Sequence, residues 1–103
     1  MPRSLNRAEI TGKIIELGAL RHTPAGIAAV EFKIRHESEH EEAGTKRKVL
    51  VEIPAIAFET QAKLIAQAKL DSGLTAKGFL ATKSRRSKRL ILHVTHIEFI
   101  EGA

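Results

Sequence analysis

Residues 75–97 read TAKGFLATKSRRSKRLILHVTHI, and they decide the fold because two alternating segments flank one short basic connection. The segments Thr75–Thr82 and Leu90–Ile97 have the period of two that is typical of half-buried β-strands. The connection, Lys83–Arg89, carries five positive charges in seven residues. Clustered Lys and Arg on a hairpin loop are typical of proteins that bind polyanions, nucleic acids above all. The alternative is a solvated loop that only maintains solubility, and charge alone does not separate the two.

The composition favours one compact domain without catalytic machinery. With 103 residues, 43% of them hydrophobic, the chain is expected to form a single domain, 1–103, whose core needs no disulfide or metal. Cysteine is absent, which excludes a disulfide scaffold, a Cys-based zinc site and a thiol nucleophile. No GxSxG elbow, phosphate-cradling glycine loop or convincing carboxylate pair is present, so we expect neither an enzyme nor a cofactor.

Charge and hydropathy bound the location and the partners. The net charge is +5 and the isoelectric point is about 9.9, so the chain is basic. No window approaches the roughly 18 apolar residues of a membrane span, and residues 1–7 contain no apolar signal-peptide core. We therefore expect a cytoplasmic protein. Binding to anionic lipid would call for an amphipathic basic helix, which the one candidate helix does not provide.

Alternation along the chain predicts five strands and one helix. The expected strands are residues 9–14, 28–35, 46–53, 74–82 and 90–100, and the expected helix is residues 58–70. Residues 18–26 read as a turn and residues 37–45 as a polar connection, while Pro54 ends the third strand or places it at an edge. Five strands with a helix between the third and fourth is the element order of the all-β OB-fold, a five-stranded Greek-key barrel. An SH3-like barrel, the main alternative, carries its helix elsewhere.

Side-chain parity predicts which residues are buried. The residues expected on inward or shared faces are Ala28, Val30, Phe32 and Ile34 of the second strand, and Ala62, Ile65, Ala66 and Lys69 of the helix. We expect Phe58 and Phe99 to pack, and His93 and His96 to be half-buried. The alternation breaks at Phe79, beside Gly78, which predicts a β-bulge. The alternative is that Phe79 is exposed for base stacking.

The acidic run before residue 45 raises a metal hypothesis, which we reject. His36, Glu37, His40 and Glu41 carry ligand atoms, and their spacing would suit one face of a helix. Gly44 and the hairpin context favour a loop instead, and no third fixed ligand is evident. We expect no metal, and a solvated acidic loop over residues 37–42.

The chain resembles the family of primosomal replication protein N (PriB), the OB-fold relatives of bacterial single-stranded DNA-binding protein. The resemblance spans nearly the whole chain through Asn6-Arg7, Gly12, Thr23-Pro24-Ala25-Gly26-Ile27, Phe32, His36, Glu41-Glu42-Ala43-Gly44, Pro54, Gly78-Phe79, Leu92-His93 and Ile97-Glu98. It implies a homodimer that binds single-stranded DNA. It also implies a role in restarting stalled replication forks together with the primosomal helicase PriA.

The chain departs from this family in its aromatic residues. In the family's pattern, aromatic side chains on and just before the third strand stack on bases, and the matching positions here are Leu50 and Thr45. Only four aromatic residues are present, all of them Phe. Base–aromatic stacking contributes about 1–3 kcal/mol per base, so we expect a protein that relies mainly on phosphate contacts.

The DNA-binding residues are expected on the third strand and the basic loop. The candidates are Lys46, Arg47, Lys48, Leu50, Lys83, Arg85, Arg86, Lys88 and Arg89, with Lys13, Arg35 and Arg21 as weaker ones. Because an OB-fold binds oligonucleotides around strands two and three and the loops after strands one and four, we expect Lys46–Lys48 to lie near Lys83–Arg89. Leu50 could contact a base or a dimer partner. A protein-interaction adaptor and an RNA-binding OB module remain open as alternatives.

Overall fold

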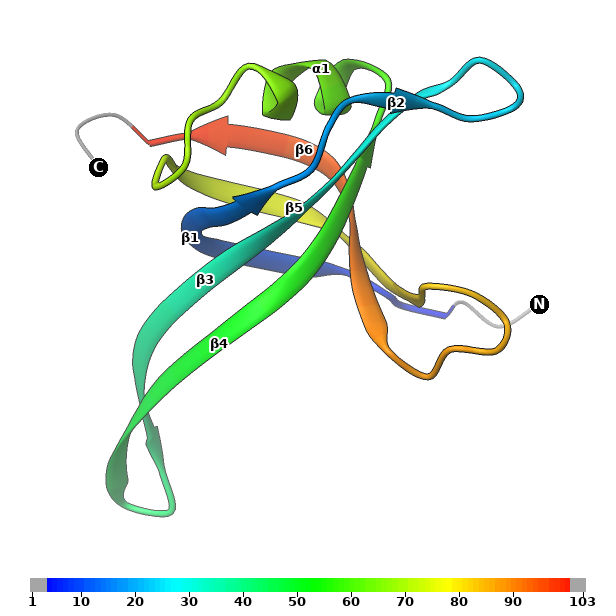
Figure 1. Cartoon of the computed structure of the whole chain (residues 1–103). Coiled ribbons are helices and arrows are strands. Elements are labelled where there is room, and N and C mark those ends of the chain that lie inside the picture. Colours follow the sequence, from blue (N-terminus) through cyan, green and yellow to red (C-terminus); the bar gives the residue numbers. More distant parts are fainter. Residues whose placement is uncertain (1–3, 101–103) are drawn as a thin grey trace.

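The computed structural model describes residues 4–100 as a closed barrel with one helix at its end (Figure 1). The strands are β1 (Ala8–Leu17), β2 (Arg21–His22), β3 (Ala28–Glu42), β4 (Thr45–Phe58), β5 (Gly73–Thr82) and β6 (Leu90–Phe99), and the helix is α1 (Thr60–Ala66). The strands lie in the order β1-β5-β6-β4-β3-β2, and a further β1–β3 pairing closes the barrel. This is the expected OB-fold, with the two-residue β2 added to the five expected strands.

Strand β1 closes the barrel by pairing with two different neighbours. Its first half pairs with β5 from Ala8 to Lys13, and its second half pairs with β3 from Lys13 to Leu17. The chain must pass very close to β3 at this crossing, because a Cβ on Gly12 would collide with the carbonyl oxygen of Arg35. Glycine is therefore required at the point where one strand serves two sheet edges.

The expected bulge next to Gly78 is confirmed. The β5–β6 register shifts between Lys77 and Gly78, and a Cβ on Gly78 would collide with the carbonyl oxygen of His93. Bulges of this kind bend a strand around the corner of a small barrel. The break in alternation therefore reflects curvature, and it turns the Phe79 side chain to the outside.

The barrel interior is filled by apolar side chains from every long strand, all of them aliphatic except Phe32. The four residues of β3 predicted to face inward, Ala28, Val30, Phe32 and Ile34, are all buried. Ala62 and Ile65 of α1 are buried against them, and Ala66 packs on the same cluster. The helix is shorter than expected, because Phe58 still belongs to β4 and Lys69 is exposed beyond the end of the helix.

The segment 37–45 is not the polar connection that its composition indicated. Strands β3 and β4 continue as an antiparallel ladder to the pair Glu42↔Thr45, and only Ala43 and Gly44 form the turn, with φ of 53° and 77°. Two positive φ values are what a tight two-residue hairpin needs. The hairpin therefore projects from the barrel as a long arm (Figure 1).

Pro54 does not end its strand, since β4 runs to Phe58. Pro54 pairs with Lys33 of β3 on one side, and β4 gains its second neighbour, β6, only from Ala55 onward. One edge of β4 is still open at Pro54, and an open edge tolerates a residue without an N–H donor. No helix within residues 4–100 is long and apolar enough to cross a membrane.

Candidate nucleic-acid interface

The loop from Lys83 to Arg89 is held by its own backbone and serines. The Lys83 amide donates to the Arg89 carbonyl at 3.2 Å, and the Ser87 amide donates to Ser84 at the same distance. The Ser87 hydroxyl accepts a hydrogen bond of 3.1 Å from the Arg89 amide. These contacts hold the loop without using its basic side chains, so all five cationic side chains remain exposed.

The ion pairs of residues 4–100 separate two kinds of cation. In the loop, only Lys83 has a carboxylate partner, Glu31, at 3.4 Å. The loop cations without a carboxylate partner among the described residues are Arg85, Arg86, Lys88 and Arg89. On the arm, by contrast, Lys46 pairs with Glu39 at 3.9 Å and Arg47 with Glu42 at 3.0 Å. A phosphate that reaches these four loop cations displaces no carboxylate of residues 4–100, whereas one that reaches Lys46 or Arg47 competes with Glu39 or Glu42.

The two basic clusters do not converge, so that expectation is wrong. Lys83 contacts Glu31, whereas Lys46 lies opposite Glu41, ten residues further along β3. At about 3.3 Å per residue the separation is roughly 33 Å. Figure 1 likewise shows the arm tip and the β5–β6 loop far apart. The extension of the hairpin as regular strands carries Lys46–Lys48 away from the barrel.

The clusters instead mark two ends of one outward face. Strand alternation places Glu31, Lys33, Arg35, Glu37, Glu39 and Glu41 of β3 on the same face as Ile56, Pro54, Glu52, Leu50, Lys48 and Lys46 of β4. Arg47, one residue from Lys46, lies on the opposite face. Leu50 is 57% exposed on the shared face, beside a cavity of about 510 Å³ that Lys48 and Glu39 also line.

Near the barrel, this face has a second cavity beside the loop. It measures about 320 Å³ and is lined by Glu31, Lys33, Glu52, Pro54, Lys83, Arg89, Leu90 and Ile91. Lys33 makes an ion pair of 2.7 Å with Glu16. The hydrogen bond and the charge of Glu16 raise the pKa of Lys33 above its usual value.

Two of the three weaker candidates, Lys13 and Arg35, are brought together. They lie directly opposite each other in the β1–β3 register and line one cavity of about 480 Å³ with Thr11, Gly12, Ile15, Glu37, Asp71, Gly73 and Ile100. Arg35 also pairs with Glu37 at 3.6 Å. Arg21 is not free either, because it shares Glu31 with Lys83 at 3.3 Å.

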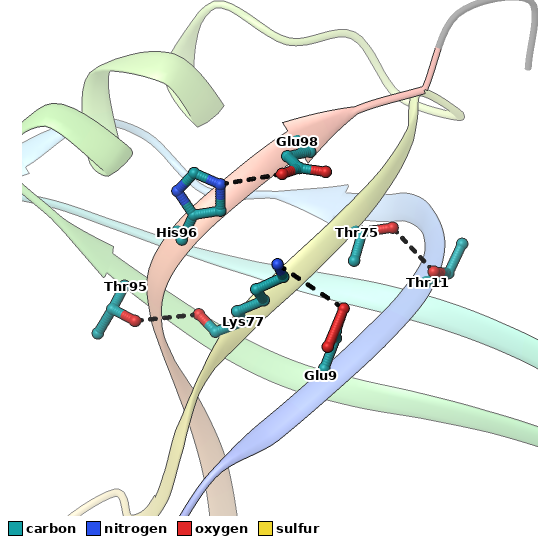
Figure 2. A network of polar contacts seen from close by, with 7 residues as sticks. All are labelled: Glu9, Thr11, Thr75, Lys77, Thr95, His96 and Glu98. Atoms are coloured by element: carbon teal, nitrogen blue, oxygen red, sulfur yellow. Dashed lines mark hydrogen bonds and ion pairs between the residues drawn. The ribbon is translucent and has the colours of Figure 1, made fainter.

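The outer face of β1, β5 and β6 carries balanced polar groups rather than a basic surface (Figure 2). Lys77 approaches Glu9 at 3.9 Å, and Thr11 and Thr75 share a hydrogen bond of 2.8 Å. His96 was expected to be half-buried; it is exposed and pairs with Glu98 at 3.3 Å. We therefore do not assign nucleic-acid binding to the part of this face that these polar groups occupy.

The histidines of the arm are engaged in hydrogen bonds rather than gathered with carboxylates. His36 Nδ1 contacts the Thr11 carbonyl at 2.7 Å, and His36 Nε2 contacts the Ser38 hydroxyl at 2.7 Å. The same hydroxyl contacts His40 at 2.8 Å. Because residues 36–41 form a strand rather than a loop, the histidines and the glutamates between them point to opposite faces. Among residues 4–100 no group of three potential ligands is suited to a metal ion.

Two phenylalanines are placed differently from the prediction. Phe32 is buried as expected, but Phe58 and Phe99, which were expected to pack, are 38% and 44% exposed. Phe58 and Phe79 both stack on His93, which is half-buried as expected. Sequence reasoning missed this row because it relied on the size and hydrophobicity of Phe. The signal that could have found this row is that Phe58 has the same parity on β4 as Ile56, which faces outward.

Comparisons with known proteins agree on the family. The model of a family described as another single-strand binding protein family matches residues 6–96. Over 99 residues, the chain is 38% identical to replication restart protein PriB of Bordetella pertussis, covering 96% of this chain and 92% of the relative. It is 39% identical over 99 residues to PriB of Nitrosomonas europaea, covering 94% and 92%.

Solved structures share the fold. A structure of PriB from Ralstonia solanacearum superposes with a TM-score of 0.84 at 28% identity, covering 93% of this chain and 98% of that one. The single-stranded DNA-binding protein of Thermus aquaticus superposes with a TM-score of 0.80 over 98% of this chain and 52% of that one, and its 18% identity supports the fold alone. The chain thus belongs to the PriB group of the single-strand binding protein family.

Proposed function

We propose that this protein binds single-stranded DNA as an accessory of replication restart, through binding and bridging rather than catalysis. The observation that carries the proposal is the basic loop, where four exposed cations have no carboxylate partner among the described residues. The names of the PriB relatives and of the matching family supply the biological setting. A replication-restart role also supports the expected cytoplasmic location.

Phosphate contacts supply most of the affinity in this proposal. The loop is the primary anchor, since its cations exchange only water and counterions for phosphate. From the loop, the single-stranded DNA runs along the outward face of β3 and β4, past Lys33 and Leu50 toward Lys48. The carboxylates on that face weaken the attraction along the arm, so contacts there are secondary.

A homodimer and a contact with the primosomal helicase PriA complete the proposal. In support of the dimer, the residues of β1 before Lys13 pair with β5 only, which leaves the other edge of that half-strand open to a second copy. Two copies would double the track available to DNA. The PriA contact rests on the family resemblance.

A protein-interaction adaptor is the second candidate. Leu50 is 57% exposed on a face that also presents Glu37 and Glu39, a combination suited to a basic, partly apolar partner surface. In that case DNA binding would be weak and incidental, and replacing Leu50 would reduce partner binding without changing DNA binding.

A salt series of single-stranded DNA binding, with mass measured in parallel, tests the proposal. Labelled oligo-dT should bind in a way that weakens steeply with salt, and the mass should equal two chains. Unlabelled DNA and RNA strands of matched length should then be compared as competitors. Absence of DNA binding at low salt, or a clear preference for RNA, would contradict the proposal.

A further inference from the structure

Three rings form a row across the outside of the barrel, and the phosphate-binding scheme above does not use them. Phe58 comes from β4, His93 from β6 and Phe79 from β5, which are neighbouring strands. The Phe79 and His93 rings stack at 4.9 Å with an interplanar angle of 15°. The Phe58 and His93 rings lie 6.1 Å apart at 29°.

The row leaves aromatic surface open to solvent. Phe58 is 38% and Phe79 39% exposed, so neither ring is used to fill the core. His93 is half-buried between them, and none of the side-chain hydrogen bonds within residues 4–100 involves its ring. Exposed apolar rings beside a polar ring with unused nitrogens form a surface suited to a flat ligand that has both a π-face and polar edges.

The row lies next to the basic loop on the same side of the sheet. In the β5–β6 ladder, Phe79 lies opposite His93, three residue pairs from the base of the loop at Thr82↔Leu90. Three residues of strand correspond to about 10 Å. Ile91 lies on the same face as His93 and lines the cavity that Lys83 and Arg89 also line. Cations for phosphates and rings for bases are therefore adjacent.

We propose that the Phe58–His93–Phe79 row is a base-stacking platform for the single strand whose phosphates the Lys83–Arg89 loop binds. This inference rests on the proposed function and gives it a second component. Every nucleobase has a π-face, so stacking adds affinity without selecting a sequence. The absence of aromatic side chains at Thr45 and Leu50 then does not leave the protein without a stacking surface, and binding does not rely on phosphates alone.

A single tryptophan reports directly on stacking, because the chain contains no Trp or Tyr. In Phe79→Trp, the fluorescence should be quenched when oligo-dT binds. The matched control is Phe99→Trp, an exposed position, 44% accessible, at the other end of β6. Its fluorescence should not change. Equal signals from the two variants, or DNA binding without quenching at position 79, would overturn the platform.

Truncation combined with an abasic ligand separates stacking from general damage. Phe79→Leu and Phe58→Leu should each weaken binding to oligo-dT about 5- to 100-fold, the effect of losing one stacked base. An abasic strand of equal length should bind the native protein more weakly and should bind native and variant proteins equally. Undiminished binding by both variants, or an equal loss on the abasic strand, would overturn the platform.

The outcomes distinguish this inference from the proposed function. If the native protein binds no single strand at low salt, the proposed function fails and the platform fails with it. If the native protein binds but the truncated variants lose nothing, only the platform is overturned. Thermal unfolding of each variant, compared with the native protein, identifies a loss of binding that arises from unfolding, and the Phe79→Trp signal then decides the question.

Discussion

The loop makes a quantitative prediction through the salt dependence of binding. For single-stranded DNA, the logarithm of affinity falls with the logarithm of salt concentration with a slope of about −0.7 for each phosphate neutralised. If each of the four loop cations that have no carboxylate partner within residues 4–100 neutralises one phosphate, the loop contributes a slope of about −2.8. From 50 to 200 mM salt, the loop alone should then reduce affinity about 50-fold.

Replacing Arg85 and Arg86 with Ala removes half of the contribution that the loop makes to the salt slope. The slope should become shallower by about 1.4, so that the loop contribution over the same fourfold salt range falls from about 50-fold to about 7-fold. Fluorescence anisotropy of labelled oligo-dT, titrated at several salt concentrations, measures the slope. The variant should keep its fold, because the hydrogen bonds of the loop come from its backbone and serines.

Two control variants separate local contacts from overall charge. The double variant Lys63→Ala, Lys69→Ala also removes two positive charges, but from exposed positions in and just beyond α1. Its salt slope should equal that of the native protein. Lys83→Ala should flatten the slope less than either arginine replacement does, because Glu31 at 3.4 Å already partly neutralises Lys83. An unchanged slope in the arginine double variant, or an equal change in the helix control, would refute the assignment of the loop.

Three further changes test the electrostatics and the fold. Glu31→Gln removes the carboxylate partner of Lys83, so oligo-dT should bind more tightly and with a steeper salt slope in the same titration; weaker binding would contradict this. Gly78→Ala places a Cβ against the backbone of His93, and it should destabilise the fold by about 1–3 kcal/mol or more in urea unfolding; an unchanged midpoint would mean that the bulge tolerates a side chain. Ile65→Ala empties a fully buried position between helix and barrel, which should cost about 2–5 kcal/mol in the same assay; a loss well below 1 kcal/mol would mean that α1 is not packed as described.

The parts of the fold that depend on alternation could be predicted from the sequence. The inward residues of β3, the bulge at Gly78 and the position of the basic loop all follow from side-chain period and glycine placement. The arm could not be predicted in this way, because beyond the barrel both of its faces meet solvent and the apolar period disappears. There the strands are marked by opposite charges across the ladder, such as Glu41 facing Lys46, and this pattern becomes visible only once the register is known.

The sequence predicted which residues belong to the candidate site better than it predicted how they are arranged in space. Sequence reasoning predicted the basic loop and placed Lys46, Lys48 and Leu50 among the DNA-binding candidates of the third strand. It did not find that carboxylates occupy much of the arm, since ion pairing depends on cross-strand register. It also expected Phe58 to pack at the start of the helix, because a large apolar residue is usually buried; the structure places Phe58 in β4 with its ring partly exposed.

The two ends of the outward face of β3 and β4 differ in how their cations are paired, and this predicts where DNA binds first. At the barrel end, the loop presents four cations that have no carboxylate partner among residues 4–100, and at the arm end Lys46 is already paired with Glu39. Exposed ion pairs stabilise by only about 0–1 kcal/mol each, so DNA can replace them, but each replacement leaves a carboxylate near a phosphate. A single strand should therefore bind first at the loop and extend toward the arm only as length permits. Affinity should rise with oligonucleotide length up to the span of the loop and the ring row, and then increase much less for each added nucleotide.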